Sequence, residues 1–352
     1  MKYIALILIV AFTACSNDPL MVNEKDFSNS MRSGHTKVAA QKLITEMAFW
    51  ENRLNKDTGN FVDMLEIAKC RLTLFKLTGN TADLHKGDSL LNESSAKLRN
   101  TNPGILYSLS QASITQHKFK FAADFNESAR KADADHYTIS LLDFDVSMEL
   151  GRYKNALKDL NAIMDKHSFD YLIRRAKWED HHGDLNGAIK LMEEAFEDVK
   201  ESKKSLFIWT LSNLSDMYGH AGRIKDAYNG YISVLRKDPD NLYCLKGLAW
   251  IAYSHDHNYT LAKKLLNFIQ SETSMPDLEL MLADINESEG NIRAKEAHIK
   301  NFISTVSGPY FGNMYNKYLI NIYAAQPSET KKAVELAEKE ILNRFTPETC
   351  RR

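Results

Sequence analysis

Apolar residues recur at helical spacing along the chain from residue 37 onward. In the stretch 37–54, Val38, Leu43, Met47 and Trp50 lie near one face of a helix with about 3.6 residues per turn. No stretch shows the sustained alternation of apolar and polar residues that is typical of a half-buried strand. The pattern predicts an all-α chain. Glycine (15) and proline (7) are scarce among the 352 residues, as expected of a chain with few hairpins or bulges.

A longer pattern repeats along the chain. The stretches 148–164, 180–196 and 219–235 each place a glycine before a helical segment and an alanine five residues after that glycine. The glycines are Gly151, Gly183 and Gly222, and the alanines are Ala156, Ala188 and Ala227. Gly290 continues the series, and Ala122 and Ala262 take the alanine place in copies with an altered turn.

This pattern resembles the tetratricopeptide repeat (TPR), a helix–turn–helix unit of about 34 residues. The copy that matches best is 208–241, where Leu211, Leu214, Tyr218, Gly222, Ala227, Tyr231 and Pro239 occupy motif positions. The resemblance covers roughly residues 60–345 and implies a TPR-like α-α superhelix of about seven or eight helical pairs. The phrases "FWENRLNKDTGNFVDMLEIAKCRL", "FKLTGNTADL" and "ELAEKEILNRFTPET" also resemble bacterial TPR lipoproteins of unassigned function.

The first residues have the order of a secretory signal peptide. Lys2 precedes an apolar run at 4–12, which is far shorter than the roughly 20 residues of a membrane-spanning helix. Small residues follow and then Cys15, so "FTAC" resembles the lipobox of bacterial lipoproteins, although Phe12 stands where that motif usually has Leu. We predict a signal peptide at 1–14 and lipidation of Cys15. The alternative is an ordinary signal peptide with an incidental cysteine.

The residues after Cys15 predict where the folded domain lies. The segment 15–36 lacks helical periodicity and is rich in Ser, Asn and Asp, which indicates a lipidated N-terminus and flexible tether before a repeat domain at 37–352. Several acyl chains on one residue anchor a protein stably to a lipid bilayer. Ser16, rather than the Asp that marks inner-membrane retention in such lipoproteins, favours the bacterial outer membrane.

No motif for catalysis, cofactor binding or metal binding is found. Neither His181–His182 nor His255 with His257 has the i, i+4 spacing of zinc hydrolases, and no phosphate-binding glycine loop is present. Cys70, Cys244 and Cys350 form no C-x-x-C motif; the first two are expected to be packed as small apolar groups. With a net charge of -1, nucleic-acid binding is not expected.

The resemblance implies that the first helix of each repeat lines a concave groove in which a partner protein or peptide binds. Mapped from the glycine of each turn, the predicted groove residues are Trp209, Asp216, His220, Tyr243, Lys246, Trp250 and Tyr253. Neighbouring repeats add Asp145, Met148, Glu149, Lys177, Asp180, His181, Ser212, Asp284 and Glu287. Aromatic side chains are enriched at binding hot spots, but such rings also pack between helices as core.

Three functions fit these observations. The first is a membrane-anchored protein–protein interaction scaffold without catalysis or cofactor. The second is a solute-binding lipoprotein that presents a glycan or peptide to a transporter. The third is an enzyme, which requires a buried polar cluster that the sequence does not show.

Overall fold

The computed structural model describes residues 20–32, 34–165, 167–199 and 203–344. Within these ranges the chain is all helical and contains no strand, as the apolar pattern predicted. The α-helices are α1 His35–Leu54, α2 Phe61–Thr78, α3 Thr81–Lys97, α4 Pro103–Thr115, α5 Phe119–Lys131, α6 His136–Glu149, α7 Tyr153–Ala162, α8 Phe169–His181, α9 Leu185–Val199, α10 Lys204–His220, α11 Ile224–Lys237, α12 Leu242–Ser254, α13 Tyr259–Glu272, α14 Asp277–Ser288, α15 Ile292–Val306, α16 Asn316–Ala324 and α17 Thr330–Asn343. Short 3-10 helices occupy Glu24–Asp26, Ser28–Ser30 and Pro327–Glu329.

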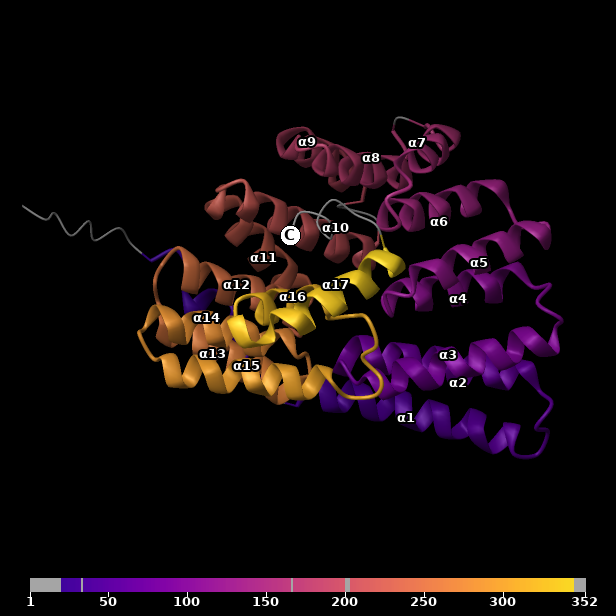
Figure 1. Cartoon of the computed structure of the whole chain (residues 1–352), viewed down its shortest axis with the longest axis horizontal. Coiled ribbons are helices and arrows are strands. Elements are labelled where there is room, and N and C mark those ends of the chain that lie inside the picture. Colours follow the sequence, from indigo (N-terminus) through magenta and orange to yellow (C-terminus); the bar gives the residue numbers. More distant parts are fainter. Residues whose placement is uncertain (1–19, 33, 166, 200–202, 345–352) are drawn as a thin grey trace, which may run out of the picture.

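After α1, the helices pack as eight successive antiparallel hairpins, from α2–α3 to α16–α17, within the described residues. Figure 1 shows these hairpins following one another round a curved path. The predicted number of helical pairs is therefore confirmed. None of the described helices combines the length and the apolar character that crossing a membrane requires.

The turns explain the glycine–alanine pattern. Gly151, Gly183, Gly222 and Gly290 all have positive φ angles, between 68° and 89°, and end the first helix of a hairpin in the left-handed conformation that glycine adopts without a Cβ clash. In the two altered copies His117 (φ 55°) takes this place five residues before Ala122, and His257 (φ 51°) takes it before Ala262. The five alanines of the pattern, Ala122, Ala156, Ala188, Ala227 and Ala262, have no exposed surface, so two helices approach closely at each.

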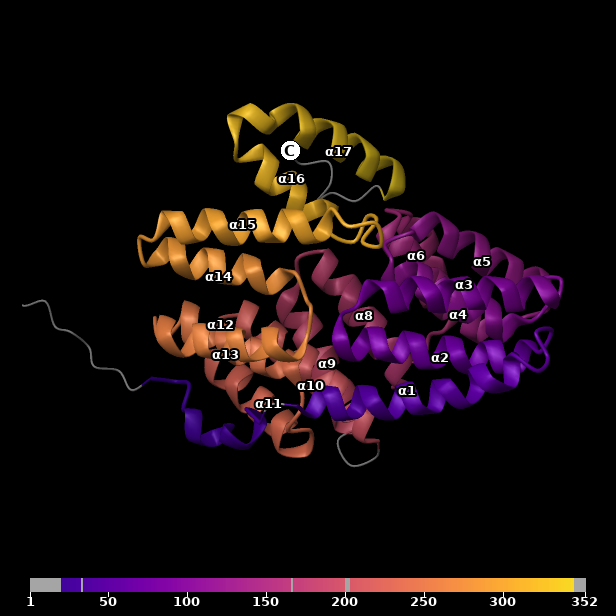
Figure 2. The same cartoon turned by 90° about the horizontal axis from the view of Figure 1, so that it is seen from below.

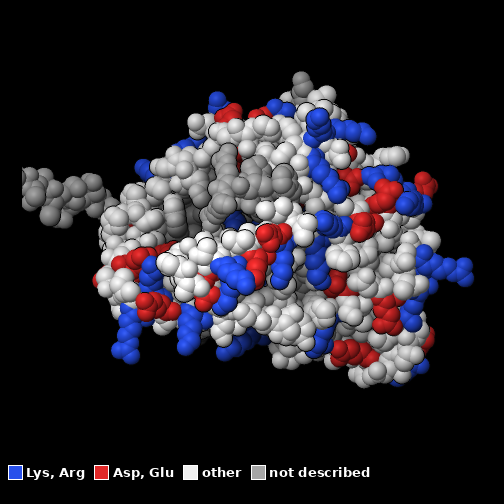
Figure 3. Space-filling model, viewed as in Figure 1, with Lys and Arg blue, Asp and Glu red and all other residues white. Residues whose placement is uncertain are grey.

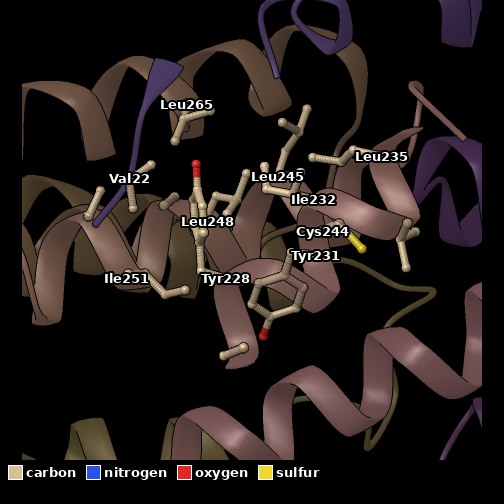
Figure 4. Packing of buried hydrophobic residues seen from close by; sticks show 14 of the residues in the cluster. Val22, Tyr228, Tyr231, Ile232, Leu235, Cys244, Leu245, Leu248, Ile251 and Leu265 are labelled. Atoms are coloured by element: carbon tan, nitrogen blue, oxygen red, sulfur yellow. The ribbon is translucent and has the colours of Figure 1, made fainter. Parts of the chain in front are cut away.

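The N-terminal segment 20–32 is not a free tether, and this part of the sequence-based interpretation is wrong. Val22 and Phe27 are 4% and 2% exposed and belong to the largest apolar cluster, which extends over α8 to α14. Figure 4 shows Val22 beside the side chains of that cluster. The Asp256 carboxylate accepts hydrogen bonds from the backbone N–H groups of Met21 (2.9 Å) and Val22 (2.8 Å). Helical periodicity does not reveal such a segment, because its apolar contacts are made by irregular backbone and 3-10 turns.

We call residues 20–32 the strap. The predicted lipidation site Cys15 and the predicted signal peptide lie outside the described residues, as does Cys350. The remaining cysteines, Cys70 and Cys244, are both buried and unpaired, as predicted. Of the apolar residues predicted for the first helix, Met47 is buried whereas Val38 is 61% exposed.

Contacts between distant repeats close the superhelix on itself. The Glu272 carboxylate, at the end of α13, accepts hydrogen bonds from the backbone N–H groups of Gly34 (2.7 Å) and Thr36 (3.3 Å) at the start of α1. The backbone N–H of Ser274 donates to the carbonyl of Thr78, at the end of α2 (2.8 Å). The start of α1 and the end of α2 are thereby held against the α13–α14 connection.

The last hairpin lies over one side of the ring of helices (Figures 1 and 2). The Asn343 side chain donates to the carbonyl of His117 (2.8 Å), and Arg344 forms an ion pair with Glu149 of α6 (3.2 Å). In the view of Figure 2 the α16–α17 hairpin lies beyond α14 and α15, at one side of the ring of helices. Burial lowers the pKa of His117, which lies at this contact.

Candidate partner-binding groove

A cavity of about 500 Å³ opens between the first helices of three successive hairpins. These helices are α6, α8 and α10, and α9 contributes one residue to the lining. The lining residues are Asp145, Ile173, Arg174, Ala176, Lys177, Asp180, Met192, Trp209, Asn213, Asp216 and Met217. The volume falls in the range of small-ligand sites and of pockets for a few side chains of a partner.

Trp209 forms the most prominent apolar surface of the cavity. It lies in the second turn of α10 and is 45% exposed. Its ring meets the edge of the Phe169 ring, with centroids 6.1 Å apart and planes at 69°. Ile173, Met192 and Met217 add further apolar surface to the lining. A large exposed ring beside flexible methionines suits a surface that a partner covers.

The two basic side chains of the cavity are already occupied. The Arg174 guanidinium pairs with Asp145 (2.7 Å) and donates to the carbonyls of Leu141 and Asp170 (both 3.2 Å). Its side chain is only 12% exposed. The Lys177 ammonium pairs with Glu149 (3.2 Å), which also pairs with Arg344 of the last hairpin. Glu149 thus connects the rim of the cavity to the end of α17.

Asp216 is held by two phenols from neighbouring helices. The hydroxyl of Tyr231 donates to one carboxylate oxygen of Asp216, and the hydroxyl of Tyr243 donates to the other. Burial and the Asp216 charge both raise the pKa values of these two tyrosines well above the ordinary range. The phenols therefore stay protonated and hold the Asp216 carboxylate in place at the cavity.

Asp180, on the last turn of α8, is a further acidic residue of the lining. It is exposed, and its carboxylate makes no hydrogen bond or ion pair with any residue in the described ranges. It lines the same cavity as Trp209 and Asp216.

The structure brings together only part of the predicted groove. Trp209 and Asp216 line the cavity, as do Asp145, Lys177 and Asp180, and Tyr243 reaches it through Asp216. His220 ends α10 as an exposed residue outside the lining. Residues missed by the sequence reasoning include Ile173, Asn213 and Met217; the last two follow Trp209 at four-residue steps, so the helical period could have found them.

Three further residues predicted for the groove, Lys246, Trp250 and Tyr253, contact neighbouring helices instead. The Lys246 ammonium pairs with Asp277 (2.7 Å). Trp250 is half-buried and lies so close to Gly219 that a Cβ there would be 3.0 Å from the indole ring. The Tyr253 hydroxyl is 3.2 Å from the Ser288 hydroxyl. For Trp250 the geometry favours the alternative of a ring packed between repeats.

A second cavity, of about 660 Å³, lies between α5, α6 and α7. Its lining is dominated by charged side chains of both signs, and Arg130 pairs there with Glu127 and Asp143. Figure 3 shows Lys and Arg interspersed with Asp and Glu over much of one face of the molecule. This cavity has no exposed aromatic ring in its lining, so we regard the cavity at Trp209 as the candidate groove.

Within the described ranges no group of three or more His, Cys, Asp or Glu side chains could hold a metal ion. Burial raises the pKa of the Cys244 thiol to about 12, which keeps it protonated and unreactive at neutral pH.

No protein-family model matches the sequence. No curated protein matches it significantly either. Among solved structures, the chain is similar to human IFIT1, solved as a dimer with PPP-AAAA, over 81% of this chain and 69% of that one, with a TM-score of 0.55 and 13% identity. It is similar to Cut9 of the APC/C hetero-tetramer Cut9–Hcn1 over 76% of this chain and 47% of that one (TM-score 0.50, 15% identity). A tetratricopeptide repeat protein from Parabacteroides merdae matches over 69% of this chain and 92% of that one (TM-score 0.45, 16% identity).

The chain has the fold of a TPR superhelix. The helical hairpins, their left-handed turns and the buried alanines after those turns all agree with these structural similarities. At such low identity the similarities establish the fold alone.

Proposed function

We propose that this protein is a membrane-anchored TPR-type scaffold that binds a partner protein or peptide in the groove at Trp209. The observation that carries the proposal is an indole ring, 45% exposed, in a cavity of about 500 Å³ formed by the first helices of three hairpins. A partner that binds such a surface buries a large apolar area, and tryptophan is strongly enriched among the residues that dominate binding energy. The scaffold carries out no catalysis and needs no cofactor.

The chemistry of the groove supports a peptide or protein partner. Apolar surface from Trp209, Ile173 and Met217 lies next to hydrogen-bonding groups such as Asn213, so the groove offers anchors for several side chains. Arg174 and Lys177, each paired with a carboxylate, fix the shape of the rim. Cut9, whose fold is similar, is described in a hetero-tetramer with Hcn1, which is consistent with a protein-binding role for this fold.

Membrane attachment is the second part of the proposal. It rests on the signal-peptide pattern and on Cys15, which would carry the acyl chains in the bacterial outer membrane. The strap begins at residue 20, and a chain spans at most about 3.4 Å per residue, so the acylated residue lies within about 17 Å of the folded domain. The domain is therefore held close to the bilayer rather than on a long tether.

Capture of a partner tests the groove. We expect the tagged full chain to retain a defined protein after cross-linking in the cells that produce it, and Trp209→Ala to lose that protein. Phe121→Ala is the matched control, because Phe121 is also an exposed aromatic residue (60%) but lies on the outer helix α5. A protein that is captured equally by wild type and Trp209→Ala would contradict binding at the groove.

Fractionation tests the anchor separately. The wild-type chain is expected in the membrane fraction with an acyl-modified N-terminal peptide detected by mass spectrometry. Cys15→Ser should be found in the soluble fraction with its fold unchanged. Equal membrane association of both proteins would contradict lipidation at Cys15.

A further inference from the structure

The charges of the groove point to the kind of side chain that it accepts. Both basic groups in the lining have carboxylate partners, Arg174 with Asp145 and Lys177 with Glu149. Two acidic groups remain without a basic partner among the described residues. Asp180 has no partner, and Asp216 accepts only the two uncharged phenols of Tyr231 and Tyr243. The cavity therefore holds two uncompensated negative charges.

The same cavity provides apolar contact for a long aliphatic stem. Trp209 exposes nearly half of its surface, and Met217 lies two turns further along the same helix. Lysine and arginine bury their methylene stems against apolar surface while their charged ends remain at polar groups. A cation near an indole ring gains further favourable energy from the ring's negative face.

We infer that the groove binds a lysine or arginine side chain of a peptide partner, with the aliphatic stem against Trp209 and Met217 and the charged group at Asp180 and Asp216. This inference rests on the proposed function, because it names the chemistry of the partner at the same site. Charge complementarity selects a basic segment over an acidic or purely apolar one, since Asp180 and Asp216 repel carboxylates. It also predicts that binding weakens as salt is added, because Asp180 is exposed to solvent.

Selection from a random peptide display library, with the purified full chain as bait, tests the inference. We expect the selected peptides to share a lysine or arginine next to apolar residues. A synthetic selected peptide should bind about tenfold more weakly when that arginine is replaced by citrulline, which is uncharged but nearly the same shape, because an ion pair to a fixed carboxylate is lost. Calorimetry measures both affinities.

Variants locate the charged contact. Asp180→Asn should weaken the arginine peptide about fivefold to tenfold and leave the citrulline peptide unchanged. Asp198→Asn, an exposed residue of α9 outside the lining, is the matched control and should change neither. Both substitutions replace exposed side chains, so both proteins should fold as wild type does.

The outcomes separate this inference from the proposed function. Selected peptides that bind at Trp209 but carry no basic residue, or equal affinities of the arginine and citrulline peptides, would overturn the inference and leave the scaffold in place. A library that yields no peptide dependent on Trp209 would overturn peptide binding at the groove and the inference with it.

Discussion

Asp256 accepts a 2.8 Å hydrogen bond from the backbone N–H of Val22, which precedes it by 234 residues. The other oxygen of the same carboxylate accepts from Met21, and the Asp256 side chain is 1% exposed. His255 lies beside it, with its Nδ1 2.9 Å from Asp256 Oδ1. This carboxylate therefore fixes the strap to the turn between α12 and α13, where the chain enters the domain.

Removal of the Asp256 charge should release the strap. In Asp256→Asn one oxygen is replaced by an NH₂ group that faces a backbone donor, so we expect the free energy of unfolding to fall by about 1–3 kcal/mol. Amide hydrogen exchange at Met21 and Val22 should become much faster than in wild type, while exchange in α4 stays the same. Unchanged protection of both strap amides would contradict this role of Asp256.

The left-handed turns give a paired prediction. Gly222 has a φ of 75° and open space around the position of a Cβ, so Gly222→Ala should lower the free energy of unfolding by about 1 kcal/mol through backbone strain alone. At the equivalent place of the next hairpin, His257 has a φ of 51°. There His257→Gly removes the strain and should raise the free energy of unfolding by about 0.5 kcal/mol. Urea unfolding measures both changes in the free energy of unfolding, and the two changes must have opposite signs.

The two phenols that donate to Asp216 should contribute unequally to the free energy of unfolding. Tyr231 is 2% exposed, so Tyr231→Phe leaves a carboxylate oxygen without its buried donor and should cost about 1–2 kcal/mol. Tyr243 is 43% exposed, and water replaces its hydroxyl in Tyr243→Phe, so the expected cost is about 0.5 kcal/mol or less. Equal costs for the two changes would contradict a larger contribution from Tyr231, the more deeply buried of the two phenols.

Asp159, in the cavity between α5, α6 and α7, should make the stability of the fold depend on pH. Burial and the nearby Asp143 charge raise the pKa of Asp159 to about 6. The folded state thus holds this proton more tightly than the unfolded chain, whose Asp pKa is about 3.9. The stabilisation from this group is fully present below about pH 4 and is lost as the pH rises through about 6.

An uncharged residue at this position should remove that dependence. We expect the gain in free energy of unfolding from Asp159→Asn to be about 1 kcal/mol larger at pH 7.5 than at pH 5. Guanidinium unfolding at the two pH values measures the difference. A gain of the same size at both would contradict the raised pKa.

The repeat signal in the sequence predicted the fold well because it is local. Each glycine–alanine spacing encodes one turn and one close helix contact, and these features hold even where His117 and His257 replace the glycine. The helical period likewise placed Trp209 and Asp216 on the same face of α10.

Contacts between distant repeats could not be predicted in this way. Nothing in the local pattern indicates that Asp256 holds Val22, that Glu272 meets the start of α1, or that Arg344 reaches Glu149. The positions of Trp250 and Tyr253 depend on how neighbouring repeats stack, and for the same reason their roles as groove residues did not follow from spacing alone. Superhelical closure is a sum of small rotations between repeats, which the sequence of one repeat does not specify.

The most direct test of the partner-binding groove is site-specific photo-cross-linking in the cells that produce the protein. A benzophenone amino acid is placed at position 213, which lines the cavity one turn after Trp209, in one variant and at position 121 of α5 in a second. We expect a defined cross-linked protein from position 213 that is absent from position 121. The same product from both positions, or a product from position 121 alone, would contradict a partner in the groove between α6, α8 and α10.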